Sequence, residues 1–540
     1  MIITDIIRSF KMKKITAVLC IILFAVTGCS KNAQTRTVEG EITGQGASID
    51  TETDNEDYLT ISSNMAKTLN PLVNSDETVD AALSLLYEKL IVIDAQGKAQ
   101  PNIADSWTFD DDGSTVYINL KNNVCFSDGT RLTAYDVAYS LKTIDNAENS
   151  YYKSCVDNIK TWSVTGDYSI SVTFYGSTGR NIYYLAIPII SRTFYGGEYA
   201  DEDTNTDTAL GTGYYRFESY EKPDKLTLIA SLNCFKGMSG VNRIDVIMTK
   251  DSETTINLFS QGITDIIAVD STKAGDAAGR IGVKSTPYKT NEYDFIGFNF
   301  NNEILQDRHV RQAIAYAIDK DSLIEGIYLG NAEKAYSPVS SSSWLYDSSV
   351  YGYDYDLSVA KMLLEQSGWM FRSGSDDVRQ SSGDSPKKLS LSILVNGENN
   401  ERKQVGIKLA ESLEGLGFEI VLETVNFDTY KQRLENGSYD IFIGTWNLSP
   451  VEDYTFMFGS QELNGEDWNL INYSSTKMDE YLTACRAAVS DDDMKAAYSS
   501  LQKYISQELP YISLVFRESN LYTSSRIDGD MAPIMYSVYN

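Results

Sequence analysis

Histidine is almost absent from this chain, with His309 the single example among 540 residues. A Ser/His/Asp relay needs a histidine as its base, and zinc enzymes usually bind their metal through two or three of them. Neither a GxSxG nor an HExxH motif occurs. The sequence therefore disfavours both kinds of hydrolase, and we expect no enzyme. A pair of acidic residues serving a secreted glycosidase is the remote alternative.

Cysteine is also scarce. Two of the six lie near the amino terminus, at Cys20 and Cys29, and the others are Cys125, Cys155, Cys234 and Cys485. No CxxC or CxH spacing occurs, so a zinc framework is excluded and we expect neither a metal site nor a cofactor. The sequence leaves open whether these four cysteines are free thiols or disulfides.

Positive charge is low relative to negative charge. The chain has 46 Lys and Arg against 75 Asp and Glu, which gives a formal charge of −29. Such a balance opposes binding to nucleic acid and favours solubility. Aromatic residues, by contrast, are plentiful, with 36 Tyr, 19 Phe and 6 Trp. We expect part of this aromatic surface to line a ligand site.

No apolar run is long enough to span a bilayer. The longest near the amino terminus, residues 15–26, follows the basic residues Arg8, Lys11, Lys13 and Lys14 and has the length of a signal-peptide core. Met12 would be a sufficient start for this signal. The run ends in Val26-Thr27-Gly28-Cys29, which resembles the lipobox of bacterial lipoproteins, in which the cysteine carries the lipid. We expect a signal peptide over 1–28 and a lipid anchor at Cys29, the alternative being an incidental cysteine.

The next segment, residues 29–57, is polar and nearly free of large apolar side chains. It cannot bury enough surface to offset the entropy cost of ordering, so we expect a flexible tether. Folding is expected to begin near Tyr58.

Strand and helix patterns alternate beyond the tether. Strands are predicted at 387–395, 419–425 and 439–446, with helices at 400–418 and 427–437 between them. This order predicts an α/β fold with a mixed sheet flanked by helices, in which ligands bind at the carboxyl ends of the strands. The segment 97–206 reads as more irregular with short strands, and 373–386 as an exposed insertion.

The segment around His309 reads as an amphipathic helix. Asp307 is a suitable N-cap, and one apolar face contains Val310, Ala313, Ile314, Ala317 and Ile318. His309, Gln312, Tyr316 and Lys320 are expected on the opposite, solvated face. His309 is therefore predicted to be a surface residue and not a catalytic base.

Four blocks of sequence resemble the family 5 extracellular solute-binding proteins, the peptide and nickel receptors of ABC importers. The resemblance lies in the ordered blocks "YDFIGFNFNNEILQDRHVRQAIAYAIDKDSLI" (293–324), "PNIADSWTFDDDGSTVYINLKNNVCFSDGTRLTAYDVAYSL" (101–141), "LGTGYYRFESY" (210–220) and "YDYDLSVAKMLLEQSGW" (353–369). Two positions depart from the family pattern, which usually has His at Ser127 and Pro at Tyr214. The resemblance covers nearly all of the chain after the tether.

The resemblance implies a two-lobed fold of the periplasmic-binding-protein type with an extra subdomain and a ligand cleft between the lobes. Lobe 1 would comprise 58–96, 207–286 and 510–540, with the subdomain at 97–206, and lobe 2 would be 287–509. The hinge crossings would be 285–291 and 508–514. The implied function is a lipid-anchored, monomeric receptor on the extracytoplasmic face of a bacterial membrane, which delivers its ligand to an ABC permease.

The identity of the ligand is less clear from the sequence. In peptide-binding relatives an aspartate three residues after a tryptophan pairs with the α-ammonium group of the peptide, and in "GTWNLSPVEDYTF" (444–456) that place holds Ser449. Glu452 or Asp453 could supply the charge from a shifted position, or the ligand has no free amine. Both acids could instead be exposed. We expect oligopeptides, with a metal chelate or a glycoside as the alternative.

Trp446 is the best ligand candidate in the same segment, because it ends a buried strand at the carboxyl edge. A tryptophan of the lobe core is the alternative interpretation. The ligand-binding residues predicted from the sequence are Trp446, Asn447, Ser449, Glu452 and Asp453.

Overall fold

The structure is a computed structural model. It describes residues 58–196, 207–269, 275, 279, 281–372, 377–463, 469–527, 531–535, 538 and 539. The predicted signal peptide, the lipid anchor at Cys29 and the tether lie outside the described residues.

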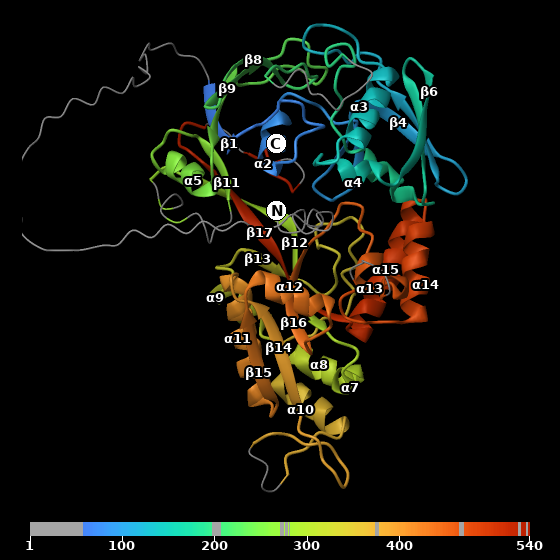
Figure 1. Cartoon of the computed structure of the whole chain (residues 1–540), viewed down its shortest axis with the longest axis vertical. Helices are drawn as coiled ribbons and strands as arrows, with labels where there is room; N and C mark the ends of the chain where they lie inside the picture. The colour runs from blue at the N-terminus through green and yellow to red at the C-terminus, as the bar shows by residue number, and fades with distance from the viewer. Residues whose placement is uncertain are drawn as a thin grey trace, which may run out of the picture. The chain divides into compact units, whose positions relative to one another are not determined.

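One large mixed sheet connects the two halves of the fold. Its eleven strands, in spatial order, are β15 (Glu419–Val425), β14 (Ser390–Asn396), β16 (Ile441–Asn447), β12 (Lys284–Phe298), β17 (Tyr511–Thr523), β11 (Ile266–Val269), β1 (Tyr58–Asn64), β10 (Arg243–Thr249), β9 (Lys225–Ala230) and β8 (Tyr215–Glu221), with β13 (Ala332–Lys334) paired to β17. The long strands β12 and β17 run side by side between the blue-to-green strands and the orange strands (Figure 1).

Two smaller sheets belong to the amino-terminal half. Their strands are β4 (Ala104–Phe109), β5 (Thr115–Leu120), β7 (Ser169–Phe174) and β6 (Ile159–Gly166) in one, and β2 (Ile91–Ile93) with β3 (Ala99–Pro101) in the other. The four-stranded sheet lies inside the segment predicted to hold short strands, and that prediction is confirmed.

Helices cover both halves of the sheet. The first half has α2 (Glu77–Leu83), α3 (Ala134–Asn146), α4 (Lys153–Val156), the 3-10 helix η2 (Gly179–Leu185) and α5 (Ser252–Ser260). The second half has α7 (Glu303–Gln306), α8 (Arg308–Tyr316), α9 (Lys320–Gly326), α10 (Leu357–Gln366), α11 (Asn400–Gly415), α12 (Phe427–Glu435), α13 (Thr455–Phe458), η4 (Ser460–Leu463), α14 (Thr476–Ala487) and α15 (Asp491–Glu508). Among the helices of the described residues, none has the length and apolarity needed to cross a bilayer.

The predicted strand–helix alternation is confirmed from β14 to β16. Helix α11 packs on β14 and β15, as Figure 1 shows, through Val405, Leu409 and Leu413, which are buried at helical spacing. The side chain of Asn399 caps this helix by accepting a hydrogen bond from the backbone N–H of Arg402 at 2.8 Å. Local periodicity and capping are therefore sufficient to fix these elements.

Buried apolar side chains form two separate main cores. The first gathers residues between Ile61 and Val246, together with Ile266, Val451 and Leu521. The second gathers residues between Ile296 and Val515. Strand β17 contributes to both cores, with Leu521 in the first and Ile512, Leu514 and Val515 in the second. Two cores are expected for a chain of this length, because a single core stops growing at about 250–300 residues.

The helix around His309 is confirmed, with one correction. Asp307 caps α8 by accepting from the backbone N–H of His309 at 2.9 Å, and the His309 side chain is 47% exposed. Lys320 was expected on the same solvated face, and this is wrong. Helix α8 ends at Tyr316 and a new helix begins at Lys320, so the helical phase is not continued. Lys320 is 6% exposed.

The segment 373–386 was predicted to be an exposed insertion, and one of its residues contradicts this. Arg379 is 1% exposed. Its guanidinium donates to two backbone carbonyls, from Nε to Leu416 at 2.7 Å and from Nη1 to Trp369 at 2.9 Å. The charge is buried because these carbonyls satisfy its N–H groups. Residues 373–376 of the segment lie outside the described residues.

Candidate functional site

The parallel strands in both halves of the large sheet run toward the same region. Strands β14, β15 and β16 are parallel, and β16 runs antiparallel to β12, so that its last residue, Asn447, pairs with Glu292. From the other half, β1, β10 and β11 run parallel, and the last residue of β11, Val269, pairs with Asn520 of β17. Asn520 in turn pairs with Pro287 of β12. The carboxyl ends of both strand sets therefore approach the middle of β12.

The register of β12 against β17 breaks at this place. A shift lies between the pairs formed by Lys289 and Tyr293. Such irregularities bend a strand and increase its local twist. In an open α/β sheet the carboxyl ends of the strands are also the usual ligand-binding edge. The crossover at residues 287–292 is therefore where a ligand held by both halves would lie.

Trp446 is the last residue but one of β16, at this edge, but its ring is packed by aromatic neighbours. The indole stacks on Phe295 with ring centroids 6.1 Å apart and meets Phe456 edge-on at 5.1 Å. Only 7% of Trp446 is exposed. The stacking partner Phe295 also lies face to face with Tyr511 at 4.2 Å. The structure thus places Trp446 at the end of an aromatic cluster of the second half, at the edge where β16 meets the crossover.

Three predicted residues, one at the end of β16 and two in the following loop, are exposed. Ser449 accepts a hydrogen bond from the backbone N–H of Val451 through its hydroxyl at 3.2 Å. Asp453 accepts from the backbone N–H of Thr455 at 2.9 Å, at the start of α13. Asn447 is the exposed last residue of β16. In this structure, neither Ser449 nor Asp453 is enclosed as a buried charge partner would be.

Glu452 differs from its neighbours, because its carboxylate points inward. One oxygen, Oε1, accepts from the Ser343 hydroxyl at 2.8 Å. The other, Oε2, is buried, and no described residue donates a hydrogen bond to it. Burial raises the pKa of Glu452, although the positive charge of Arg180 and the Ser343 hydrogen bond oppose this. The backbone of Glu452 has φ +52°, a left-handed conformation uncommon for a residue with a side chain.

The positive charge that acts on this carboxylate belongs to Arg180, in η2 of the amino-terminal half. It is 2% exposed, and its Nη2 donates to the backbone carbonyl of Pro450. The guanidinium lies over the ring of Tyr183 at 4.1 Å and of Tyr498 at 5.8 Å. Burial, the largest single effect, opposes the charge, but Glu452 and the neighbouring tyrosine hydroxyls together outweigh it and the pKa of Arg180 is raised. The Nε and Nη1 atoms of Arg180 have no hydrogen-bond acceptor among the described residues.

Nothing in the sequence marks Arg180 or Ser343 as part of this site. Arg180 lies 270 positions before Pro450, the residue it contacts. It follows a short polar stretch with no motif or periodicity of its own. Only the folded chain places it beside the loop after β16.

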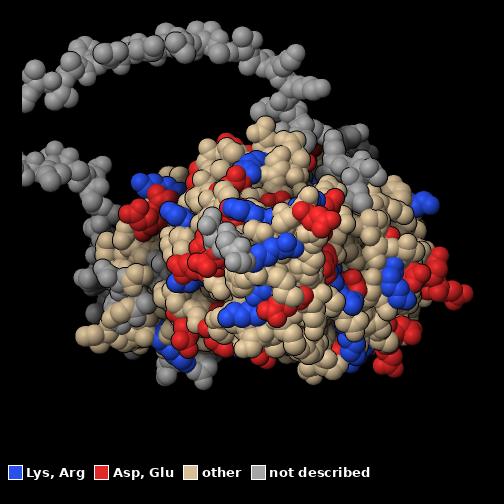
Figure 2. Space-filling view, turned by 90° about the horizontal axis from the view of Figure 1, so that it is seen from below, with Lys and Arg blue, Asp and Glu red and all other residues tan. Residues whose placement is uncertain are grey.

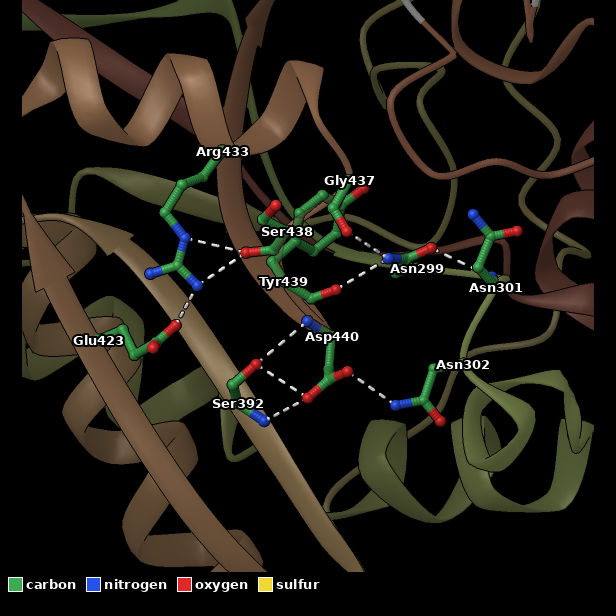
Figure 3. Close-up of a pocket in the computed structure, with 10 residues that line it drawn as sticks. All are labelled: Asn299, Asn301, Asn302, Ser392, Glu423, Arg433, Gly437, Ser438, Tyr439 and Asp440. Carbon is green, nitrogen blue, oxygen red and sulfur yellow. Dashed lines mark hydrogen bonds and ion pairs between the residues drawn. The ribbon is translucent and has the colours of Figure 1, made fainter.

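A polar cavity of about 360 Å³ lies at the opposite edge of the second half. Figure 3 shows its lining side chains turned toward one another. Asp440 accepts from the Asn302 amide at 2.7 Å and from Ser392 at 2.7 and 2.8 Å, and Arg433 pairs with Glu423. The cavity adjoins the start of β16, whereas the loop 447–453 follows its end. These polar groups pair with each other, so the lining of the cavity is an internal hydrogen-bond and ion-pair network.

Metal-ligating side chains are not clustered in the described part of the chain. No group of three or more His, Cys, Asp or Glu side chains in this part of the chain is placed to hold a metal ion. Cys125, Cys155, Cys234 and Cys485 are all free thiols. On the face drawn in Figure 2, acidic and basic side chains are interspersed.

The fold defines a class of protein. An ABC transporter substrate-binding protein from Sinorhizobium meliloti has a similar structure, with a TM-score of 0.77, 19% sequence identity, and coverage of 89% of this chain and 98% of that one. NikZ from Campylobacter jejuni, solved with Ni(L-His), has a TM-score of 0.64 and 23% identity, covering 88% of this chain and 95% of that one. The architecture is therefore that of a periplasmic-type binding protein.

Sequence comparison narrows this class to a family. The chain belongs to the bacterial extracellular solute-binding proteins, family 5, whose pattern matches residues 98–466. Among curated relatives, the oligopeptide-binding protein AppA of Bacillus subtilis is 23% identical over 472 residues, which is 85% of this chain and 86% of AppA. This protein is thus a solute-binding protein of the extracytoplasmic type.

Proposed function

We propose that the protein is the receptor of an ABC importer and captures oligopeptides between two closing lobes. The observation that carries the proposal is the approach of parallel strand ends from both halves to the middle of β12, in a chain of family 5. A ligand bound there would touch both halves, and its contacts would favour the closed form. No covalent step is needed, so the receptor is not an enzyme.

The lobes are proposed to have the boundaries given by the resemblance. Lobe 1 is 58–96, 207–286 and 510–540 with the subdomain 97–206, and lobe 2 is 287–509. The hinges are then 285–291 and 508–514, which lie in or beside β12 and β17. The closed receptor would dock as a monomer on a membrane permease that accepts its cargo.

The peptide ligand is supported by the relatives. AppA of B. subtilis is named as oligopeptide-binding, and a second relative, DdpA of Escherichia coli, as a probable D,D-dipeptide-binding protein that is 23% identical over 88% of this chain and 91% of DdpA. A solute without a free amine, such as a metal chelate, is the second candidate. It is favoured by Ser449, which replaces the aspartate that peptide-binding relatives carry.

Ligand identity is tested by native mass spectrometry of the protein purified from rich medium, followed by thermal-shift screens with peptide, sugar and metal-chelate pools. We expect a heterogeneous set of retained masses that match short peptides, and stabilisation by peptide pools alone. A single non-peptide mass, or stabilisation by another pool only, would contradict the peptide assignment. Release of a chromophore from generic glycoside substrates would contradict the receptor role.

The lipid anchor at Cys29 is a separate part of the proposal. A lipidated cysteine would hold the folded part outside the membrane through the segment 29–57. Cys29→Ser should leave the precursor unprocessed or release the protein, which fractionation and intact mass measure. Normal membrane retention of that variant would remove the anchor from the proposal.

A further inference from the structure

The amino-terminal half has an exposed edge at the end of its strands that lies away from the crossover. Tyr58 begins β1 and pairs with Arg243 at the start of β10, and Arg243 pairs with Ile229 near the end of β9. The backbone N–H of Ser231, just after β9, donates to the carbonyl of Tyr214, just before β8, at 2.8 Å. We call this row of chain ends the amino edge, because the parallel strands β1 and β10 start there and run toward the crossover.

Large apolar side chains are exposed along the amino edge. They are Tyr58, Tyr214, Leu232, Met238, Ile263 and Ile281. Ile281 is 99% exposed, and Leu232 and Met238, in the connection between β9 and β10, are 80% and 70% exposed. Single exposed apolar groups are common on protein surfaces, but several at one place mark a surface that contacts another body.

The register of the sheet places Ile263 and Ile281 at the same edge. Ile61 of β1 pairs in parallel with Ile266 of β11, so Ile263 lies at the level of Tyr58. Strand β12 runs in the same direction as β11, because both are antiparallel to β17, and Ile281 precedes β12. The exposed apolar groups therefore extend across the starts of β1, β10, β11 and β12.

Three ion pairs at the amino edge have the base nearer to solvent than the acid. The side chain of Arg526 is 46% exposed, whereas that of its partner Asp265 is 1% exposed. The other two pairs are Arg243 with Asp245, at 36% and 13%, and Lys236 with Glu88, at 29% and 9%. Each pair thus presents its positive group outward, although the whole chain has a formal charge of −29.

The amino edge is also where the segment 29–57 meets the folded part. Tyr58 follows that segment directly, and the predicted lipid anchor at Cys29 stands at its other end. A chain of that length spans at most about 100 Å when fully extended. An anchor at Cys29 would therefore keep the edge within reach of the membrane. Exposed apolar groups next to cations are the combination that binds to the surface of an anionic bilayer.

We infer that the amino edge is a membrane-contact surface, which rests on an anionic lipid bilayer and leaves the ligand crossover free. Leu232, Met238 and Ile281 would enter the interfacial layer, and the outward cations would lie beside lipid phosphates. The inference rests on the membrane location in the proposed function. It requires neither the ligand nor the lipid at Cys29, because the contact is made by the folded part.

The contact is tested by tryptophan fluorescence of the full chain with added vesicles of phosphatidylcholine and brominated phosphatidylglycerol. Leu232→Trp should be quenched beyond the wild-type signal, because bromine atoms quench only indoles that enter the lipid layer. The matched control is Val421→Trp, at a position of β15 that is 54% exposed, and it should match wild type. No added quenching of Leu232→Trp, or equal quenching of the control, would overturn the inference.

The same signal separates the apolar and the charged contribution. Adding Met238→Ser to Leu232→Trp should lower the quenching, whereas adding Met362→Ser, at a position 49% exposed on α10, should not. Raising the salt from 0.1 M to 1 M shortens the Debye length from about 10 Å to about 3 Å and should also lower it. Quenching that is independent of salt, and equal on brominated phosphatidylcholine alone, would overturn the assignment to an anionic surface.

A second copy of this chain is the other occupant that the test distinguishes. Self-association in sedimentation velocity without lipid, lost in Leu232→Ser, would assign the amino edge to a dimer and overturn the membrane contact. Failure of the anchor is a separate result. If Cys29→Ser leaves membrane retention unchanged, the anchor proposal fails, while the quenching of Leu232→Trp by added vesicles still decides whether the edge contacts lipid.

Discussion

Asp294 of β12 and Arg517 of β17 form a buried ion pair beside the crossover, with 2.9 Å between Oδ2 and Nη2. Asp294 is 1% exposed and also accepts hydrogen bonds from Tyr328, at 2.7 Å, and from Thr445. Burial, the largest single effect, opposes the charge of Arg517, but Asp294, Tyr328 and Glu292 together outweigh it and the pKa of Arg517 is raised. One carboxylate thus ties β12, β17, β16 and the segment after α9 together next to the proposed hinge.

Breaking this pair should cost much more than breaking a surface pair. Asp294→Asn is expected to lower the free energy of unfolding by about 3–5 kcal/mol, because the buried Arg517 would lose its nearest counterion and keep only Glu292, at 3.7 Å. Urea denaturation measures the loss. The control is Glu411→Gln, whose partner Lys408 is exposed, and which should cost less than about 1 kcal/mol. Equal losses in the two variants would show that the buried pair contributes no more to stability than the exposed pair.

Trp446→Ala should reduce stability, since the indole is enclosed by Phe295 and Phe456. We expect a loss of about 3–5 kcal/mol in the free energy of unfolding, as for other buried aromatic side chains. Tyr175→Ala, at a position 72% exposed, is the control and should change it by less than about 0.5 kcal/mol. Trp446→Phe separates packing from ligand contact. If that variant keeps the stability but loses affinity, the ring also contacts the ligand.

Lys320 should make stability depend on pH in the alkaline range. Burial lowers the pKa of Lys320 to about 7, whereas in the unfolded chain it returns to about 10.4. Between these values the unfolded chain binds the proton and the folded chain does not. The free energy of unfolding contributed by this group therefore rises with pH across this interval, by up to about 1.4 kcal/mol per pH unit.

The measurement compares Lys320→Met with wild type from pH 6 to pH 9. The stability of the variant relative to wild type should be greatest below pH 7 and decline as the pH rises. Lys334→Met is the control, because the ion pair with Asp321 raises the pKa of Lys334 and its protonation does not change over this range. A flat difference for Lys320→Met would refute the lowered pKa.

The four described cysteines should differ in reactivity and form no disulfides. Burial raises the pKa of Cys485 and of Cys155 to about 12, so neither provides appreciable thiolate near pH 8. Iodoacetamide should leave both unmodified in the native protein and label all four thiols after unfolding. Peptide mapping measures the labelling of each cysteine. A disulfide that joins any two of the four cysteines would contradict the prediction.

The second half of the fold was predictable because its signals are local. Alternating apolar residues in β14, helical spacing of Val405, Leu409 and Leu413 in α11, and the cap at Asp307 each involve residues a few positions apart. Prediction failed where local periodicity was extended too far. Lys320 was assigned to the helix of His309, but the chain turns after Tyr316 and buries that lysine.

The candidate site was only partly predictable. The strand order placed the loop after Trp446 at the carboxyl edge of the sheet, but it did not separate exposed Asp453 from Glu452, whose carboxylate is enclosed. The two acids are neighbours with the same charge. Their environments differ because the loop packs against Arg180 from a distant part of the chain.

The sequence by itself determined the α/β elements, the surface position of His309 and, through its ordered motifs, the family. Only the tertiary structure decided that the carboxyl strand ends of both halves meet at the middle of β12, that Asp294 pairs with Arg517, and that Arg180 donates a hydrogen bond to Pro450 in the loop after β16. The physical reason is the separation along the sequence of the residues that interact. Helix periodicity and caps depend on neighbours within a few residues, whereas the contacts of Asp294 with Arg517 and of Arg180 with Pro450 join residues 223 and 270 positions apart.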